Sequence, residues 1–494
     1  MKAYQDASLA PARRAKALLE EMTLAEKVGQ LNQRLYGFRI YERKCVNGED
    51  TIELSEEFRQ EVEKYSGLGV LYGLYRADPW ADKDYETGLT GVLSKKAYNQ
   101  VQRYVLEHSR LGIPVMMSSE CPHGHQALDG YLLPVNLLAG ATFDPAMVRA
   151  AYRVSGRQLQ NMGVDFALMS MLDVLRDPRW GRSEECYSED PYLSARMAEA
   201  AVIGMQESGP EVVAKHFAAQ GEGTGGVNAS AARIGERELR EIHFPPAAAA
   251  IKAGAKGIMA AYNEIDGVYC HANRWLLNDV IRKEMGFDGI VMSDGVAIDQ
   301  LDSMTGDNVV SGALALQSGV DVGLWDEAFG KLEEAVRRGL VKEAQIDQAV
   351  LRVLTLKFER GLFEHPYLEE EGEIHMDYAQ NPESVQLARE GLVILQNKNQ
   401  VLPFWENQAS GKKIAVVGPN ADDLYNQLGD YTPPLRRNDG ITVLDGMKLI
   451  FKESDIRFSQ GCYLRKRDEN LLKEAVDTAK NSDIVICVLG GSSS

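Results

Sequence analysis

The chain has 494 residues, of which 45% are hydrophobic and 26% charged, and its formal net charge is −18 at pH 7. This composition is typical of a soluble globular protein, and the length suggests about two or three domains. Nucleic acid and anionic membrane surfaces both require basic patches, so we expect neither as a partner. The acidic balance is compatible with a neutral small-molecule substrate, and oligomeric state is left open.

Cysteine usage and the N-terminus bear on the cellular compartment. The six cysteines are scattered and form no CxxC pair, which disfavours a disulfide framework in a chain of this size. The first 22 residues hold no apolar core followed by a small-residue cleavage site, and no apolar run reaches the length of a membrane span. We therefore expect a reduced, cytoplasmic protein, although a chain whose leader had been removed would show the same features.

The first part of the chain predicts a barrel. Two helices are expected within the first 35 residues, and Thr23-Leu-Ala-Glu26 fits a capping box for the second of them. Seven strands are then expected at 69–74, 114–117, 164–168, 212–216, 257–262, 289–293 and 319–323, with helices that include 145–162, 191–207, 235–253, 275–285, 327–338 and 346–359. This alternation predicts a TIM-like (β/α)8 barrel, whose eighth strand the pattern does not reveal.

The pattern changes after residue 363, so we expect a catalytic barrel over 1–363. Residues 364–384 hold proline, acids and no periodicity, which indicates a linker. A second α/β unit is expected over 385–494, with strands at 391–396, 413–418 and 483–490 and a weaker one at 441–450. Because the most apolar strand comes last with nothing to cover it, we expect an incomplete α/β sandwich domain. A small complete domain with a tail is the alternative.

Polar side chains follow the ends of several predicted strands. They are Glu120, Arg182, Lys215 with His216, Tyr262 and Asp294. One such acid is more readily a helix N-cap than a catalyst. In a barrel, however, all these strand ends converge on one mouth, and together they favour a binding or catalytic site. Structural ion pairs for Glu120 and Arg182, and core positions for Tyr262 and His216, are the alternatives.

Two other motifs suggest a metal or a cofactor, and we expect neither. Cys121, His123 and His125 form a C-x-H-x-H run, but no second ligand pair accompanies them. Residues 221–226 satisfy G-x-G-x-x-G by letter, but the helix that should open at the last glycine is expected only near residue 235, which disfavours a dinucleotide site.

The chain resembles glycoside hydrolase family 3, of the β-glucosidase type, over nearly its whole length. The matching motifs lie at residues 22–30, 177–182, 188–191, 215–217, 235–241, 271–273, 286–289, 293–294 and 418–421. The resemblance implies a retaining β-glycosidase that hydrolyses terminal non-reducing β-D-glycosyl residues, expected to be β-glucosides, through a covalent glycosyl-enzyme. By resemblance, Asp294 is the nucleophile, Glu120, Arg182, Lys215 and His216 bind sugar hydroxyls, and Tyr262 is the aromatic beside the nucleophile.

Three departures from the family pattern affect these expectations. Relatives commonly have Asp where this chain has Glu120, and many have Trp where it has Gly295. A retaining mechanism also needs a second acid about 5–5.5 Å from the nucleophile. In related β-glucosidases that acid follows the strand matching 483–490, so we expect it beyond Ser494 and assign none here. A β-xylosidase, another exo-β-glycosidase, or a non-catalytic sugar-binding fragment are the alternative functions.

Overall fold

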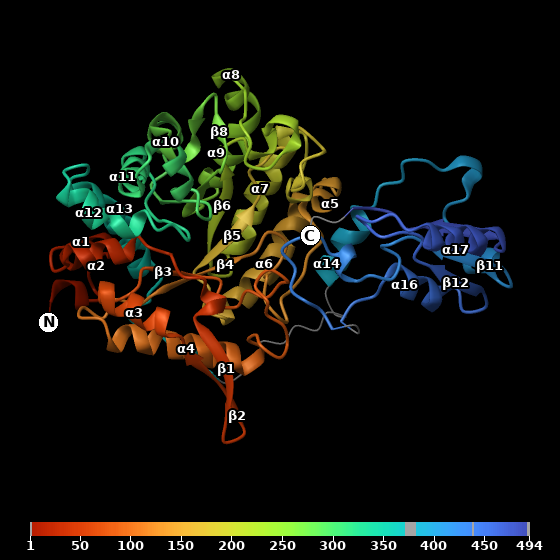
Figure 1. Ribbon diagram of the computed structural model, residues 1–494, viewed down its shortest axis with the longest axis horizontal. Helices are drawn as coiled ribbons and strands as arrows, with labels where there is room; N and C mark the ends of the chain where they lie inside the picture. Colours follow the sequence, from red (N-terminus) through yellow and green to blue (C-terminus); the bar gives the residue numbers. More distant parts are fainter. Residues whose placement is uncertain (1, 371–381, 437–438, 492–494) are drawn as a thin grey trace.

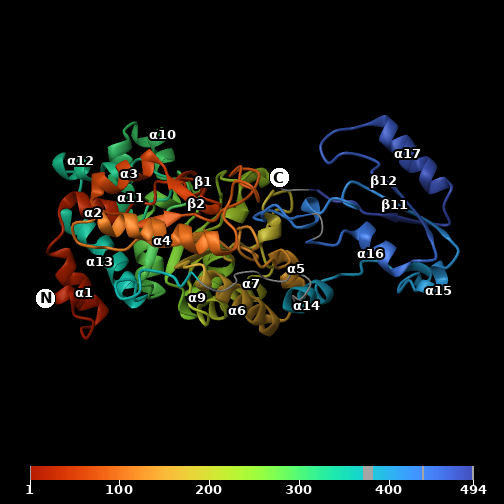
Figure 2. The ribbon, with the colours of Figure 1, turned by 90° about the horizontal axis from the view of Figure 1, so that it is seen from below.

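The computed structural model describes residues 2–370, 382–436 and 439–491. A larger barrel-like unit is followed by a smaller α/β unit at its side (Figure 1). The view from below places the second unit on the same side, with β11, β12 and α17 among its parts farthest from the barrel (Figure 2).

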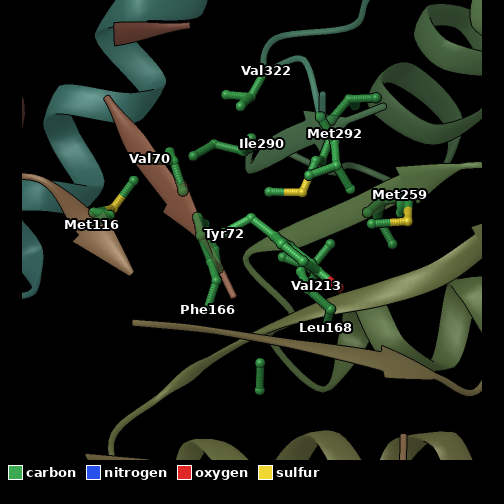
Figure 3. Close-up of a cluster of buried hydrophobic side chains, with 14 of the residues drawn as sticks. Val70, Tyr72, Met116, Phe166, Leu168, Val213, Met259, Ile290, Met292 and Val322 are labelled. Atoms are coloured by element: carbon green, nitrogen blue, oxygen red, sulfur yellow. The ribbon is translucent and has the colours of Figure 1, made fainter. Parts of the chain in front are cut away.

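The barrel is built on six parallel strands in the order β10-β7-β6-β5-β4-β3. They are β3 (Val70–Tyr72), β4 (Met116–Glu120), β5 (Phe166–Ser170), β6 (Glu211–Phe217), β7 (Gly257–Ala260) and β10 (Ile290–Met292). Nearly every residue in them is buried, which explains the continuous apolar runs in the sequence. Side chains from successive strands, among them Phe166, Val213 and Met259, form a common buried cluster (Figure 3).

Two irregular segments complete the wall between β10 and β3. Val322 forms a parallel bridge with Met292, and Tyr36 forms one with Tyr72. The two segments bond to each other through Gly323 N to Leu31 O at 3.0 Å and Trp325 N to Gln33 O at 3.0 Å. The seventh expected strand is therefore only a bridged segment, and the eighth position is taken by residues 31–36. The expected TIM-like barrel is confirmed.

Helices cover the outside of this barrel. They include α1 (Pro11–Leu19), α2 (Leu24–Gln30), α4 (Gly91–Glu107), α6 (Pro145–Asn161), α7 (Pro191–Gln206), α9 (Phe244–Lys252), α11 (Asn308–Ser318), α13 (Glu343–Glu359) and a π-helical segment, Trp275–Glu284. The capping box of α2 is confirmed, because Thr23 Oγ1 accepts from Glu26 N while Glu26 accepts from Thr23 N. Over the described residues, none of the helices combines the length and apolarity needed to cross a bilayer.

The second unit has a three-stranded parallel sheet in the order β12-β11-β13. Its strands are β11 (Lys413–Val417), β12 (Asp455–Ser459) and β13 (Ile484–Cys487), and its helices include α14 (Pro382–Glu390), α16 (Val443–Ile450) and α17 (Glu469–Lys480). Helix α14 lies against α5 (Asn136–Ala141) and α6 of the barrel. The strands expected at 413–418 and 483–490 are present, whereas β12 was not foreseen.

The strands expected at 391–396 and 441–450 are not present. The linker expected at 364–384 lies mostly outside the residues that the structure describes. Residues 392–397 are irregular, and the four apolar side chains at 392–395 are 64% to 93% exposed. An apolar run becomes a strand only where another backbone pairs with it, and no described strand does so here. Residues 443–450 form α16, which Thr442 caps by accepting from Asp445 N. Of the linker expected at 364–384, residues 371–381 lie outside the described part, and α14 begins at Pro382.

Candidate active site

A cleft of about 290 Å³ opens at the C-terminal ends of the barrel strands. It is lined by Arg76, Trp80, Glu120, Arg182, Asn228, Tyr262, Asp294, Leu324, Trp325, Asp430 and Tyr431. Four of the six site residues expected from the sequence therefore line one cleft. Lys215 and His216, at the end of β6, contact Glu120, Arg182 and Asp294, so the barrel brings all six together.

Asp294 lies two residues beyond β10, on a loop held by hydrogen bonds. Its backbone N–H donates to His271 Nε2 at 3.1 Å, and its Oδ1 accepts from Gly295 N at 2.8 Å. Burial lowers the pKa of His271 to about 4, so this ring serves as a neutral acceptor. Asp294 Oδ2 is buried and has no hydrogen-bond partner among the described residues. One carboxylate oxygen is thus fixed while the other is available to a ligand.

His216 lies 3.6 Å from that oxygen, measured from its Nε2 to Asp294 Oδ2. Its Nδ1 is 2.7 Å from Asp173 Oδ2, and its Nε2 is 3.1 Å from Arg182 Nη2. Because a guanidinium can only donate, Nε2 must accept, which assigns the ring proton to Nδ1. Asp173, which the sequence did not single out, therefore orients the ring, and His216 presents no proton to Asp294 in this arrangement.

Arg182 is held in a bidentate pair with Glu185. The distances are 2.5 Å from Nε to Oε1 and 2.9 Å from Nη2 to Oε2, and both side chains are largely buried. Burial by itself would raise the pKa of Glu185, but the Arg182 guanidinium outweighs it and leaves that pKa at about 2. The structural ion pair considered for Arg182 is therefore present, and the side chain lines the cleft as well.

Glu120 also forms a buried ion pair. Its Oε2 lies 2.6 Å from Lys215 Nζ, and the two side chains are 7% and 2% exposed. Its Oε1 accepts from Tyr72 OH at 3.2 Å, and Arg76 in turn donates to that phenol at 2.5 Å. The pair links the ends of β4 and β6, and Glu120 presents its carboxylate to the cleft.

Tyr262 is neither plain core nor solvent-exposed. Its hydroxyl donates to Gly295 O at 2.8 Å and so ties the loop that carries Asp294 to the end of β7. Burial, together with the Asp294 carboxylate, raises its pKa well above the usual range. The phenol therefore keeps its proton and stays a donor.

Sequence reasoning missed seven of the lining residues, among them a pair from the second unit and two tryptophans of the barrel. Asp430 and Tyr431 come from the second unit, and Arg182 Nη2 donates to Tyr431 OH at 3.2 Å while Lys215 Nζ lies 4.7 Å from the centre of its ring. No sequence signal places this loop on the barrel. Trp80 and Trp325, by contrast, follow predicted strands, so extending the strand-end argument to every strand would have found them.

The two cofactor-like motifs have other uses. His123 contacts Leu133 O at 2.9 Å and Asp430 O at 2.5 Å, His125 contacts Ser119 Oγ at 2.8 Å, and Cys121 lies 3.3 Å from Ser155 Oγ. No metal-binding cluster of His, Cys, Asp or Glu occurs within the described ranges. Residues 221–226 form parts of two short 3-10 turns, and the next helix starts at Glu236.

The fold and the cleft define an α/β-barrel protein whose pocket combines buried acids, buried cations and aromatic rings. The model of the glycosyl hydrolase family 3 N terminal domain matches residues 23–356, and that of the family's C-terminal domain matches residues 392–494. The chain therefore belongs to glycoside hydrolase family 3.

The chain is similar to both beta-xylosidases and beta-glucosidases. A beta-xylosidase of Formosa agariphila is 32% identical over 461 residues, covering 84% of this chain and 62% of the relative. A periplasmic beta-glucosidase of Salmonella typhimurium is 30% identical over 517 residues, covering 96% of this chain and 62% of the relative. The structure of a beta-glucosidase from Listeria innocua in complex with glucose matches with a TM-score of 0.82 and 28% identity, over 98% of this chain and 64% of that one. The chain thus spans 62% of the length of these curated relatives.

Proposed function

We propose that this chain carries the nucleophile and the sugar-binding site of a retaining β-glycosidase that removes terminal β-D-glycosyl residues. β-Glucosides and β-xylosides are the candidate substrates, because relatives of both kinds match the chain. The observation that carries the proposal is Asp294 Oδ2, a buried carboxylate oxygen that has no described partner and faces a cleft of basic and hydrogen-bonding groups.

The proposed first step is attack by Asp294 Oδ2 on the anomeric carbon of the bound sugar. A carbon–oxygen ester bond forms as the bond to the leaving group breaks, and the leaving oxygen takes a proton from an acid that we do not assign. Water then displaces Asp294 with a second inversion and gives its proton to the group that acted as acid in the first step, so the configuration is retained overall. Two hydrogen bonds hold the carboxylate in place during attack. Gly295 N donates to Asp294 Oδ1, and the Tyr262 hydroxyl donates to Gly295 O.

The buried ion pairs supply the sugar-binding groups in this proposal. Glu120 has carboxylate oxygens to accept from sugar hydroxyls, and Lys215 and Arg182 donate charge-assisted hydrogen bonds. Each of these groups is already paired, so its position is fixed before the sugar arrives. A preorganised site of this kind avoids the entropy cost of ordering long side chains on binding.

Covalent trapping tests the proposal, and it isolates the first step. The protein is incubated with 2,4-dinitrophenyl 2-deoxy-2-fluoro-β-glucoside and with the matching xyloside, whose leaving groups need little acid assistance. We expect one glycosyl adduct by intact-mass analysis, located on Asp294 by peptide mapping. Asp294→Asn should form none, whereas the control Asp266→Asn, in an exposed turn, should react like the wild type. An adduct elsewhere, or none with either sugar, would refute the assignment.

A further inference from the structure

Asp326 is a buried acid next to the cleft. Its side chain is 1% exposed, and it is not among the residues that line the cleft. Its two oxygens accept four hydrogen bonds: Oδ2 from Ser293 Oγ at 2.6 Å and Leu324 N at 3.1 Å, and Oδ1 from Ile298 N at 2.8 Å and Asp299 N at 3.2 Å. Burial of a carboxylate is costly unless such donors compensate it, so this side chain is tied firmly to the groups around it.

The bonds of Asp326 enclose the turn that carries Asp294. Ser293 directly precedes the proposed nucleophile and Ile298 follows it, so one side chain holds both ends of the turn. Val296, inside the turn, has φ of 62°, in the left-handed region that β-branched side chains disfavour. Strain of this kind persists only where surrounding contacts enforce it, and Asp326 supplies one such contact on each side of Val296.

Two segments of the chain meet at Asp326: the nucleophile segment, residues 293–299, and the wall segment, residues 322–328. Three more hydrogen bonds of 2.8 or 2.9 Å join them: from Val296 N to Leu324 O, from Glu327 N to Asp299 Oδ2 and from Ala328 N to Asp299 Oδ1. They also pack closely at Gly295, where an added Cβ atom would lie 2.6 Å from Trp325 Cε3. Because Trp325 lines the cleft together with Asp294, the nucleophile and this wall of the cleft are held as one unit.

We propose that Asp326 is a positioning residue for the nucleophile, and that it fixes the turn so that Asp294 Oδ2 is directed at the bound sugar. This inference rests on the proposed function of Asp294. Asp326 acts through the Ser293 hydroxyl and through the backbone of residues 298 and 299, without touching the sugar. A displacement of about 1 Å in a reacting group can lower a rate by about 100-fold. Loss of Asp326 should therefore slow the attack and leave sugar binding intact.

The kinetics of covalent trapping test this inference, because they separate attack from binding. Release of dinitrophenolate is followed at several concentrations of whichever 2-deoxy-2-fluoro-glycoside reacts with the wild type. The rate constant at saturation reports attack, and the half-saturating concentration reports binding. In Asp326→Ala we expect the rate constant to fall by about 10- to 100-fold, while the half-saturating concentration changes by less than about 2-fold. A residue that only supports the fold would lower the free energy of unfolding and leave this rate constant unchanged.

Three companion variants show whether Asp326 acts through the turn. Ser293→Ala removes one hydroxyl and should lower the same rate constant by a smaller factor. Asp326→Asn keeps one accepting oxygen and an amide that can donate to Ser293 Oγ, so it should recover part of the rate. Ser293→Ala combined with Asp326→Ala should be little slower than Asp326→Ala alone, because both changes remove the same contact.

Asp302→Ala is the matched control. The Asp302 carboxylate also accepts from a serine hydroxyl and an amide, but these belong to Ser311 and Asn308 of α11. Its removal should lower the free energy of unfolding and leave the rate constant for trapping unchanged. If Asp326→Ala does not fold, Ser293→Ala and Asp326→Asn decide the question against this control.

The outcomes separate this inference from the proposed function. Wild-type rate constants in the Asp326 and Ser293 variants, a loss that lies only in the half-saturating concentration, or an equal loss in Asp302→Ala would overturn the role of Asp326 while an adduct still forms on Asp294. A wild-type protein that forms no adduct on Asp294 would instead refute the proposed function, and the role of Asp326 with it.

Discussion

The buried pair of Glu120 and Lys215 offers a quantitative test of how the pocket is held together. Replacing Lys215 by Met leaves Glu120 without its ammonium partner at a position that is 7% exposed. Breaking a buried ion pair from one side costs about 3–5 kcal/mol. The low end, about 3 kcal/mol, is expected here, because Tyr72 still donates to Glu120.

The double variant distinguishes this reasoning from a general packing defect. Glu120→Gln alone should also cost about 3 kcal/mol, because Lys215 is then the unpaired charge. Lys215→Met combined with Glu120→Gln should cost much less than the sum of the two, since no buried charge remains. Arg237→Met breaks the ion pair with Glu241, in which the two side chains are 88% and 60% exposed, and should cause no detectable change.

The assay is urea unfolding at pH 7. The free energy of unfolding is compared between variants whose free energies depend on urea concentration with the same slope. It does not depend on catalysis, so the result is independent of the proposed activity. Single substitutions that each cost less than about 1 kcal/mol, as exposed pairs do, would refute the reasoning. Additive costs in the double variant would refute it too, because two coupled charges cannot behave independently.

Two further predictions concern residues around Arg182. Tyr431→Phe should lower the free energy of unfolding by only about 1 kcal/mol, because Arg182 keeps its bonds to Glu185 and His216. Tyr431→Ala also removes the ring beside Lys215. Because that ring is only partly buried at the cleft, the loss should be about 2–3 kcal/mol, below the range for a fully buried ring. Equal losses for the two substitutions, or a similar loss for the 44% exposed control Tyr463→Ala, would contradict this. Glu185, whose pKa is about 2 in the fold instead of 4.5, contributes about 3 kcal/mol that is present above pH 4.5 and lost as pH falls towards 2. Unfolding of Glu185→Gln should therefore lack this acid-dependent loss between pH 5 and pH 2, and parallel curves for variant and wild type would be inconsistent with the pair.

The barrel could be predicted because its strands carry a local signal. Buried parallel strands are apolar throughout, and helices with caps separate them, so most elements were correctly placed. The segment at 31–36 could not be found in this way, because Asn32, Gln33 and Arg34 break its apolar character. It becomes part of the barrel wall through backbone bonds to residues 323 and 325 on one side and to β3 on the other.

The second unit shows where local signals fail. The apolar run at 392–395 was expected to be a strand, yet strand formation requires a partner backbone that a sequence window does not contain. Residues 443–450 were also expected to lie in a strand, but they form a helix. Their apolar side chains have helical spacing, and Thr442 caps the helix. A capped helix needs no partner to satisfy its backbone, so it forms where a lone strand would not.

The sequence by itself determined which polar residues stand at strand ends, since that order is fixed along the chain and a barrel collects all such ends at one mouth. Only the tertiary structure decided what those residues contact. It placed Tyr431 of the second unit on Arg182 and Lys215, set the ring proton of His216 through Asp173, and laid Trp325 against Gly295. Each of these contacts joins residues at least 30 positions apart in the chain, and their geometry depends on packing that no local pattern encodes.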